Sequence, residues 1–205
     1  MTIDNTYENY VYTRKLNLNL NKIINSSYKM YDFINTNFNK SDKEYNGQIS
    51  MVEQIFASYN LLMYPYPEFY ELYYEIKKMF YDKLNPEDSD ESYYIQSWLN
   101  FYKFGDFIDW HNHWPPEVNS WHGYYCVNVE PSKTSYRLNN SEKNINVENQ
   151  NNLLVMSKSI EDQHRTWPWK YDEPRITIAF DILPAPSILN FYGENKMGVN
   201  HWVPI

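Results

Sequence analysis

The hydrophobic positions of the chain follow two different periods, and the change comes about halfway along it. In residues 19–38 and 67–86, apolar side chains recur every three to four positions, which is typical of one face of an amphipathic helix. Pro67 suits the first turn of the second segment, and an Asn-Pro pair at 85–86 suits its end. We therefore predict two helices in the first half of the chain.

After residue 92 the pattern consists of short runs rich in β-branched and aromatic residues, separated by turns, as in antiparallel strands. These runs are 93–104, 121–131, 134–138, 151–157 and 173–184. The asparagine-rich stretch 138–152 is predicted to be a surface hairpin or loop. We expect a single domain over 1–205, mainly β with flanking helices (α+β). Residues 1–92 would form a helical support region with a β edge, and 93–205 the β core with the histidines.

Composition narrows the partners and the compartment. The formal net charge is −8 with no Lys/Arg cluster, so we expect neither nucleic acid nor a membrane surface as a partner. No apolar run approaches the roughly 18 residues that span a bilayer, and the first twenty residues do not resemble a secretory signal. The single cysteine, Cys126, lies in an apolar run and suits a reducing compartment. We expect a cytoplasmic protein, in the host cell if it is viral.

The chemistry of the chain is concentrated in its histidines. Three of the five lie within twelve positions, and two of them form the pair His111-Asn112-His113. Side chains two positions apart at a strand end point to the same side, so both rings can reach one metal ion. His164 lies between two predicted strands, which could return it to the pair as a third ligand. The pair alone also fits two hydrogen-bonded surface histidines.

Arg175 lies among apolar residues in the predicted strand 173–184. A buried guanidinium must be paired, because an unpaired buried charge is strongly destabilising. A carboxylate is its best partner. Since no acidic side chain is obviously placed for this role, the carboxylate could belong to a ligand.

Taken in order, these residues resemble a known enzyme family. Tyr102, the pair His111-Asn112-His113, "GYYCVNV" at 123–129, "HRT" from His164 and "RIT" from Arg175 resemble the iron(II)- and 2-oxoglutarate-dependent oxygenases, in particular the prolyl-hydroxylase-like group with its phage and bacterial members. The resemblance covers about residues 93–183. It implies a double-stranded β-helix (jelly-roll) core buttressed by the N-terminal helices, and a dioxygenase that hydroxylates an unactivated C–H bond with Fe(II), O2 and 2-oxoglutarate.

The resemblance also implies a role for individual residues. His111 and His164 would bind iron, Arg175 would hold the far carboxylate of 2-oxoglutarate, and Thr177 would assist it with its hydroxyl group. Further co-substrate contacts are implied for Tyr102, Asn128 and one of Tyr124 or Tyr125. The implied substrate is a peptidyl proline, another protein side chain, an amino acid or a small metabolite.

One position departs from the family pattern. The family usually has a carboxylate ligand two residues after the first histidine, and this chain has His113 there. A third neutral imidazole leaves the site one unit more positive. We favour a three-histidine site of His111, His113 and His164, in which replacing His113 by Asp restores the usual ligands. The alternatives are that His113 lies behind the ligands, or that Asp109 supplies the acid.

Two other functions remain open at this point. Gly105, the His111/His113 pair, Glu117 and Gly123 have nearly the spacing of the first cupin motif. That resemblance would make Glu117 a fourth ligand in a metal-dependent dioxygenase or isomerase without 2-oxoglutarate, but it leaves Arg175 without a role. The third alternative is a catalytically silent β-helix that only binds a partner.

Overall fold

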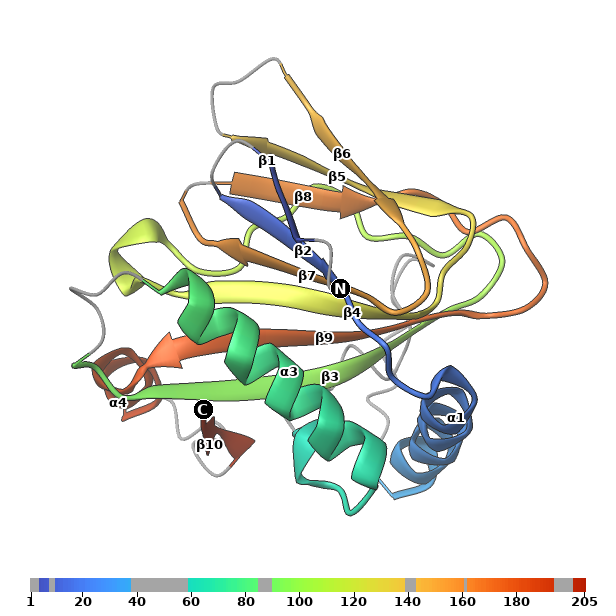
Figure 1. Ribbon diagram of the computed structural model, residues 1–205, viewed down its shortest axis with the longest axis horizontal. Coiled ribbons are helices and arrows are strands. Elements are labelled where there is room, and N and C mark those ends of the chain that lie inside the picture. The colour runs from blue at the N-terminus through green and yellow to red at the C-terminus, as the bar shows by residue number, and fades with distance from the viewer. Residues whose placement is uncertain are drawn as a thin grey trace.

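The chain folds into two stacked antiparallel sheets with helices on the outside (Figure 1). The computed structural model describes residues 4–7, 10–37, 59–84, 90–138, 143–160, 162–193 and 201–205. The polar segment 39–47, which the sequence predicts to be a loop between the two helices, lies outside these ranges. The expected class, mainly β with flanking helices, is confirmed.

The large sheet has seven strands and the small sheet has three. In spatial order the large sheet contains β1 (Asp4–Tyr7), β2 (Val11–Lys15), β7 (Leu153–Lys158), β4 (Trp121–Asn128), β9 (Arg175–Pro184), β3 (Tyr93–Tyr102) and β10 (Val203–Pro204). The small sheet contains β6 (Ile145–Asn149), β5 (Ser132–Leu138) and β8 (Asp162–Thr166). All five predicted runs form strands, and β6 lies within the predicted hairpin.

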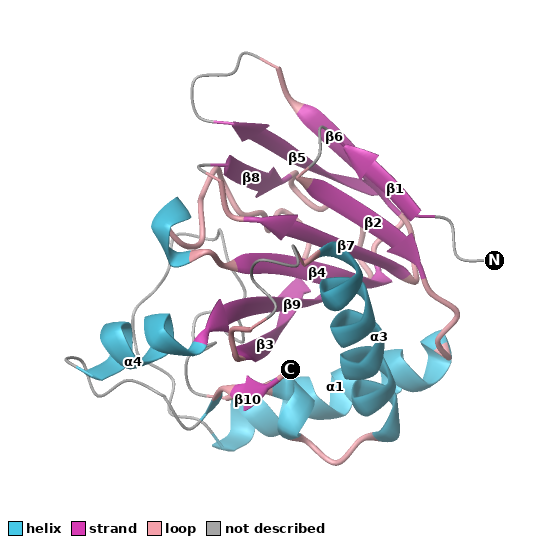
Figure 2. Cartoon of the chain, turned by 60° about the vertical axis from the view of Figure 1, so that its left-hand side comes forward, coloured by secondary structure: helices cyan, strands magenta, loops and turns pink. Residues whose placement is uncertain are grey.

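Two long helices cover the face of the large sheet that is turned away from the small sheet (Figures 1 and 2). They are α1 (Leu20–Asn37) and α3 (Pro67–Lys83), both close to their predicted bounds. The shorter helical segments are η2 (Leu61–Met63), η4 (Pro116–Val118) and α4 (Ala185–Gly193). Within the described residues, no helix is long and apolar enough to cross a membrane.

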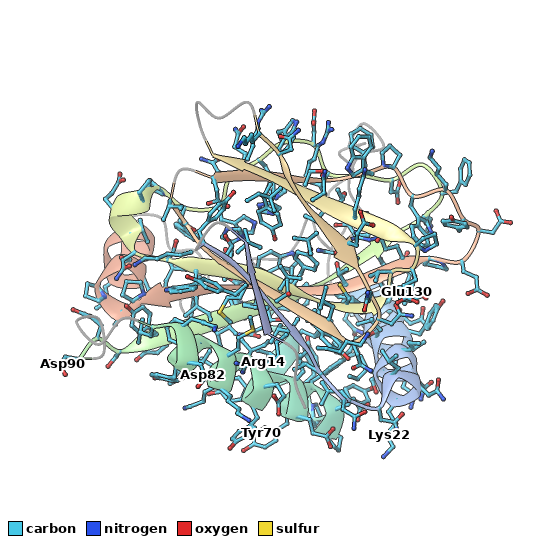
Figure 3. All side chains as sticks on the ribbon, turned by 45° about the horizontal axis from the view of Figure 1, so that its top comes forward. Arg14, Lys22, Tyr70, Asp82, Asp90 and Glu130 are labelled. Carbon is cyan, nitrogen blue, oxygen red and sulfur yellow. The ribbon has the colours of Figure 1, made fainter. Side chains whose placement is uncertain are left out.

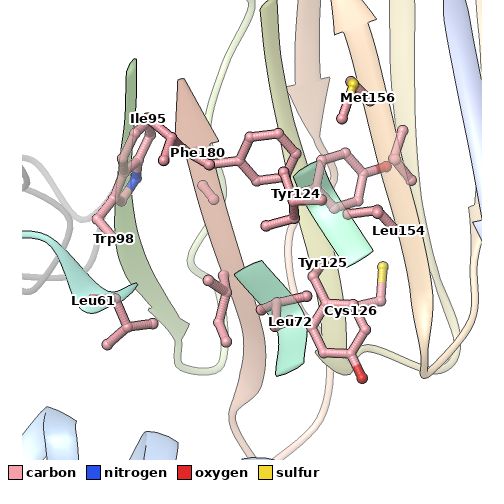
Figure 4. Packing of buried hydrophobic residues seen from close by; sticks show 14 of the residues in the cluster. Leu61, Leu72, Ile95, Trp98, Tyr124, Tyr125, Cys126, Leu154, Met156 and Phe180 are labelled. Atoms are coloured by element: carbon pink, nitrogen blue, oxygen red, sulfur yellow. The ribbon is translucent and has the colours of Figure 1, made fainter. Parts of the chain in front are cut away.

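The main core lies between these helices and the large sheet (Figure 4). The apolar face of α3 is fully buried; it comprises Phe69, Leu72, Ile76, Met79 and Phe80. The ring of Phe80 meets Trp121 of β4 edge-on, with 5.9 Å between centroids. At the sheet edge, Arg14 of β2 pairs with Asp82 of α3 at 2.8 Å (Figure 3). These contacts hold the helices against the sheet.

Strand alternation gives the large sheet two different faces. Phe101 of β3 stacks on Tyr31 of α1 with 4.3 Å between ring centroids, so this position faces the helices. Its neighbours Asn100 and Tyr102 point the other way and line a cavity between the sheets. The same alternation along β9 turns Arg175 and Thr177 toward the small sheet. One face therefore forms the core and the other carries polar chemistry.

The β edge expected within 1–92 was given no residue bounds, and in the structure β1 and β2 form one edge of the large sheet. Strands β8 and β10 were not predicted, and β8 contains His164, which was expected between strands. The sequence of β8, "DQHRT", is polar at every position, so it lacks the apolar alternation that marks a strand. The division of the chain at residue 92 stays a prediction.

Candidate metal centre

A cavity of about 490 Å³ lies between the two sheets. Its floor comes from β3, β4 and β9 of the large sheet, and its roof from β5 and β8 of the small sheet. The loop between β3 and β4 closes one side and contributes Ile108, His111, Asn112, His113 and Trp114. A site on this cavity is thus built from segments far apart in the sequence.

Three histidines converge on the cavity. Each of His111, His113 and His164 has a ligand nitrogen within 4.8 Å of the other two. A pair of backbone hydrogen bonds joins His111 to His164, with N to O distances of 3.1 and 2.9 Å. This bridge anchors the loop to β8 and brings the two rings to 4.2 Å between centroids. We refer to these three residues as the histidine trio.

Hydrogen bonds decide which ring nitrogens are free. The Nδ1 atom of His111 lies 2.8 Å from the backbone oxygen of Asp109, and that of His113 lies 2.6 Å from Oδ1 of Asp181. Both acceptors require Nδ1 to carry the proton, which leaves Nε2 with its lone pair. In His164, Nδ1 is buried and has no hydrogen-bond partner. In their neutral forms, His111 and His113 therefore each offer Nε2 to a metal ion.

The electrostatic surroundings favour neutral imidazoles at two of these positions. Burial, together with the neighbouring His113, lowers the pKa of His111 to about 4. Burial and the neighbouring histidines hold the pKa of His164 well below its usual range. His113 differs: burial lowers its pKa, but the Asp181 carboxylate opposes this and the net effect is a rise. Neutral histidine is the form that binds metals.

A second group of possible ligands shares His164. The ligand atoms of His122, Asp162 and His164 also lie within 4.8 Å of one another, and all three residues are buried. His122 Nε2 is 3.3 Å from Asp162 Oδ2, so this histidine is already paired with a carboxylate. Two His–Asp pairs thus lie at this site, His113 with Asp181 and His122 with Asp162, although Asp162 itself does not line the cavity.

Arg175 is buried beside the trio. It is 2% exposed, and its guanidinium stacks on the ring of Tyr102 at 4.6 Å. Its Nε and Nη1 atoms have no hydrogen-bond partner among the described residues. Thr177 follows it on the same face of β9, and its hydroxyl accepts a 3.3 Å hydrogen bond from Asn100. A cation with two unused donors therefore faces the cavity.

Most of the predicted site residues meet in this cavity. Those that line it are Tyr102, His111, His113, Tyr124, His164, Arg175 and Thr177. Asn128 does not: its amide donates to the backbone oxygen of Pro174 at 2.8 Å. The pairing of β4 with β9 shifts register between Cys126 and Asn128, and this bulge breaks the alternation that would have turned Asn128 inward.

Sequence reasoning missed two buried acids at this site: Asp181, which lines the cavity, and Asp162, which pairs with His122. Both share a strand face with a predicted site residue, since Asp162 is two positions before His164 and Asp181 is six after Arg175. An even spacing within a strand was the available signal.

Two acids considered from the sequence are placed elsewhere. Glu117 lies exposed in η4 and does not line the cavity. The exposed carboxylate of Asp109 accepts from the Trp110 amide at 2.8 Å. Neither is positioned as a ligand with the trio, which removes the fourth ligand that a cupin site would need.

The fold can be compared with solved structures, whereas no family model and no curated protein matches the sequence. A prolyl hydroxylase from Trichoplax adhaerens, solved with a peptide fragment of the hypoxia inducible factor oxygen degradation domain, is similar at a TM-score of 0.63 and 11% identity, over 88% of this chain and 86% of that one. AviO1 from Streptomyces viridochromogenes reaches 0.58 and 10%, over 85% and 89%.

A third similar structure is SnoK, a non-heme α-ketoglutarate-dependent carbocyclase of nogalamycin biosynthesis. Its TM-score is 0.56 at 9% identity, over 86% of this chain and 80% of that one. The fold is the double-stranded β-helix of these proteins. The resemblance noted in the sequence is confirmed at the level of the fold, because identities this low establish the fold alone.

Proposed function

We propose that this protein is an iron(II)- and 2-oxoglutarate-dependent oxygenase that hydroxylates an unactivated C–H bond. One observation carries the proposal: a buried arginine with unused donors lines the same cavity as three converging histidines. A metal site explains the histidines, and a ligand with a carboxylate would supply an anionic partner for the arginine.

The residues present fit an iron ion. His111, His113 and His164 would hold it, since imidazole nitrogen is a suitable ligand for iron. The Nδ1 atoms of His111 and His113 are each engaged by an oxygen, so each ring presents Nε2. Three imidazoles leave other coordination positions for the co-substrate and for O2. A cupin-type activity is not supported, because Glu117 is exposed.

The residues also fit 2-oxoglutarate. Arg175 would bind its far carboxylate, and Thr177, two positions along the same face of β9, would add its hydroxyl group. The Tyr102 ring under the guanidinium holds it in place. When bound, iron and 2-oxoglutarate supply the oxidising chemistry, and the chain supplies orientation and the exclusion of water. Arg175 and Thr177 are each 2% exposed, which suits the exclusion of water.

The substrate that we propose is a side chain of a protein or peptide, with proline as the first candidate. The Trichoplax enzyme with the same fold was solved with a peptide fragment, which supports this class. A small molecule is the alternative, since SnoK is named as a carbocyclase in a biosynthesis. The large rings of Trp98 and Trp114 on the cavity wall can pack against either substrate.

The test is anaerobic titration with Fe(II) and then 2-oxoglutarate, followed by measurement of succinate after O2 is admitted. We expect about one iron per chain, 2-oxoglutarate binding that requires iron, and succinate formation that a substrate accelerates. His111→Ala and His164→Ala should abolish iron binding, whereas His201→Ala, which changes a histidine outside the cavity, should not. Absence of iron from the wild-type protein would support a silent binding module instead.

A further inference from the structure

Asp181 has an unusually constrained position beside the histidine trio. It is 6% exposed and lies near the end of β9. Its Oδ1 is 2.6 Å from Nδ1 of His113, and its Oδ2 accepts a 2.9 Å hydrogen bond from Nε1 of Trp114. Both carboxylate oxygens are therefore held by consecutive residues of the loop, and the carboxylate cannot rotate without losing one of these bonds.

From this geometry we propose that Asp181 is a positioning residue of the metal centre. It holds His113 through Nδ1, and its carboxylate, in contact with that ligand, supplies the negative charge that the side chain at position 113 lacks. This inference rests on the proposed function. A carboxylate that accepts the far N–H of a ligating imidazole fixes its tautomer and orientation and makes it a stronger electron donor. It also offsets part of the positive charge of a centre with three neutral ligands.

The other buried acid provides a contrast. Asp162 is 3% exposed and pairs with His122. His122 is not a member of the histidine trio. The two acids are alike in burial and in having a histidine partner, and they differ in which histidine each one holds. If Asp181 acts through a metal ligand, its loss should weaken metal binding more than the loss of Asp162.

The geometry also changes the effect on metal binding that we expect from His113→Asp. The Nδ1 atom of histidine and an Oδ atom of aspartate are both two bonds from Cβ. An aspartate at 113 in the His113 side-chain conformation would place an oxygen roughly where Nδ1 now lies, 2.6 Å from Asp181 Oδ1. Two carboxylates this close repel each other. His113→Asp should therefore need Asp181→Asn beside it before it can provide a good ligand.

The experiment uses Co(II) as the probe, with affinity from calorimetry and coordination from the visible spectrum. The proteins compared are the wild type, Asp181→Asn, His113→Asp, the double variant of these two, and the control Asp162→Asn. We expect Asp181→Asn to weaken Co(II) binding by roughly 10- to 100-fold and to alter the visible bands. Asp162→Asn should change the affinity by less than about threefold. In the His113→Asp background, Asp181→Asn should instead strengthen binding, because it removes the repulsion.

A purely structural role for Asp181 would not produce this reversal of sign. Trp114→Phe offers a second route if Asp181→Asn folds poorly, as judged by its thermal unfolding without metal. This substitution frees one carboxylate oxygen and should also weaken Co(II) binding, but by less than Asp181→Asn does.

Unchanged Co(II) affinity in Asp181→Asn would overturn the inference and leave the proposed function intact. Loss of binding only in Asp162→Asn would overturn it in favour of the group His122, Asp162 and His164. Absence of Co(II) binding by the wild type would contradict the proposed function itself.

Discussion

At the scale of the residue, Arg175 combines a buried positive charge with two N–H donors that have no hydrogen-bond partner among the described residues. We predict that Arg175→Met weakens 2-oxoglutarate binding at least tenfold, since a charge-assisted contact with a desolvated carboxylate is worth about 2–5 kcal/mol. Iron binding should remain. The measurement is anaerobic calorimetry of 2-oxoglutarate with the iron-loaded protein.

Arg165→Met is the matched control for this change. Arg165 lies on β8 and stacks on Trp110 and Trp167, at 4.7 and 4.3 Å, but it does not line the cavity. The Arg165→Met substitution should therefore leave the affinity for 2-oxoglutarate near the wild-type value. Equal losses in the two variants would mean that Arg175 has no special relation to the co-substrate.

The different pKa shifts within the histidine trio predict how metal binding depends on pH. His113 has a raised pKa in the metal-free protein, whereas that of His111 is about 4 and that of His164 is well below normal. Above pH 5, a metal ion therefore displaces a proton from His113 alone. Affinity should be full above the raised pKa of His113 and should fall about tenfold per pH unit below it.

This slope can be measured from Co(II) dissociation constants between pH 5 and 9. Slopes of two or three decades per pH unit would mean that His111 or His164 also holds a proton in this range, contrary to the burial of both rings.

At the scale of the element, β4 depends on a close approach that only glycine permits. A Cβ on Gly123 would lie 2.3 Å from the backbone oxygen of Val155 in β7 and 2.5 Å from the ring of Phe180 in β9. The Val155 oxygen belongs to a neighbouring strand of the same sheet, so it cannot withdraw easily. We predict that Gly123→Ala lowers the free energy of unfolding by about 1–3 kcal/mol, the usual cost of overpacking, as measured by urea denaturation.

Gly105→Ala separates this steric cost from a backbone cost. A Cβ there would meet nothing within 4 Å, but Gly105 has a φ of +90°, which a residue with a side chain adopts at a cost of about 1–2 kcal/mol.

The repulsion at Gly123 should also disturb the packing of Phe180, which can be detected in near-ultraviolet circular dichroism. A Gly123→Ala protein as stable as the wild type would show that β4 and β7 can separate.

At the scale of the whole molecule, the candidate metal centre would join the two sheets, because His164 belongs to the small sheet and the loop with His111 and His113 starts from the large one. Metal should therefore stabilise the complete fold. At a concentration 100 times its dissociation constant, a ligand that binds only the folded state contributes about 2.7 kcal/mol. For a chain of this size, that corresponds to an increase of roughly 5–10 °C in Tm.

The measurement is thermal unfolding with Mn(II), which avoids oxidation, with and without 2-oxoglutarate. We expect 2-oxoglutarate to raise Tm further when the metal is present, and His164→Ala to remove both increases. An equal increase in His164→Ala would place the metal elsewhere on the protein.

The sequence by itself determined the elements whose signal is local. The face of α3 could be read from its spacing, and the burial of Arg175 from its apolar neighbours, because side-chain period and burial follow directly from helix and strand geometry. The histidine pair, His164 and Arg175 could likewise be selected as chemically unusual residues in or between predicted strands.

Only the tertiary structure decided the partners. His113 and Asp181 are 68 positions apart in the sequence, and no local pattern specifies that a particular carboxylate meets a particular ring. The same holds for β8, which forms a strand despite its polar sequence because β5 pairs with it, and for Asn128, which a bulge in β4 turns away from the cavity. Strand register and hydrogen-bond partners depend on how distant segments pack, and a shift of one residue exchanges the two faces of a strand.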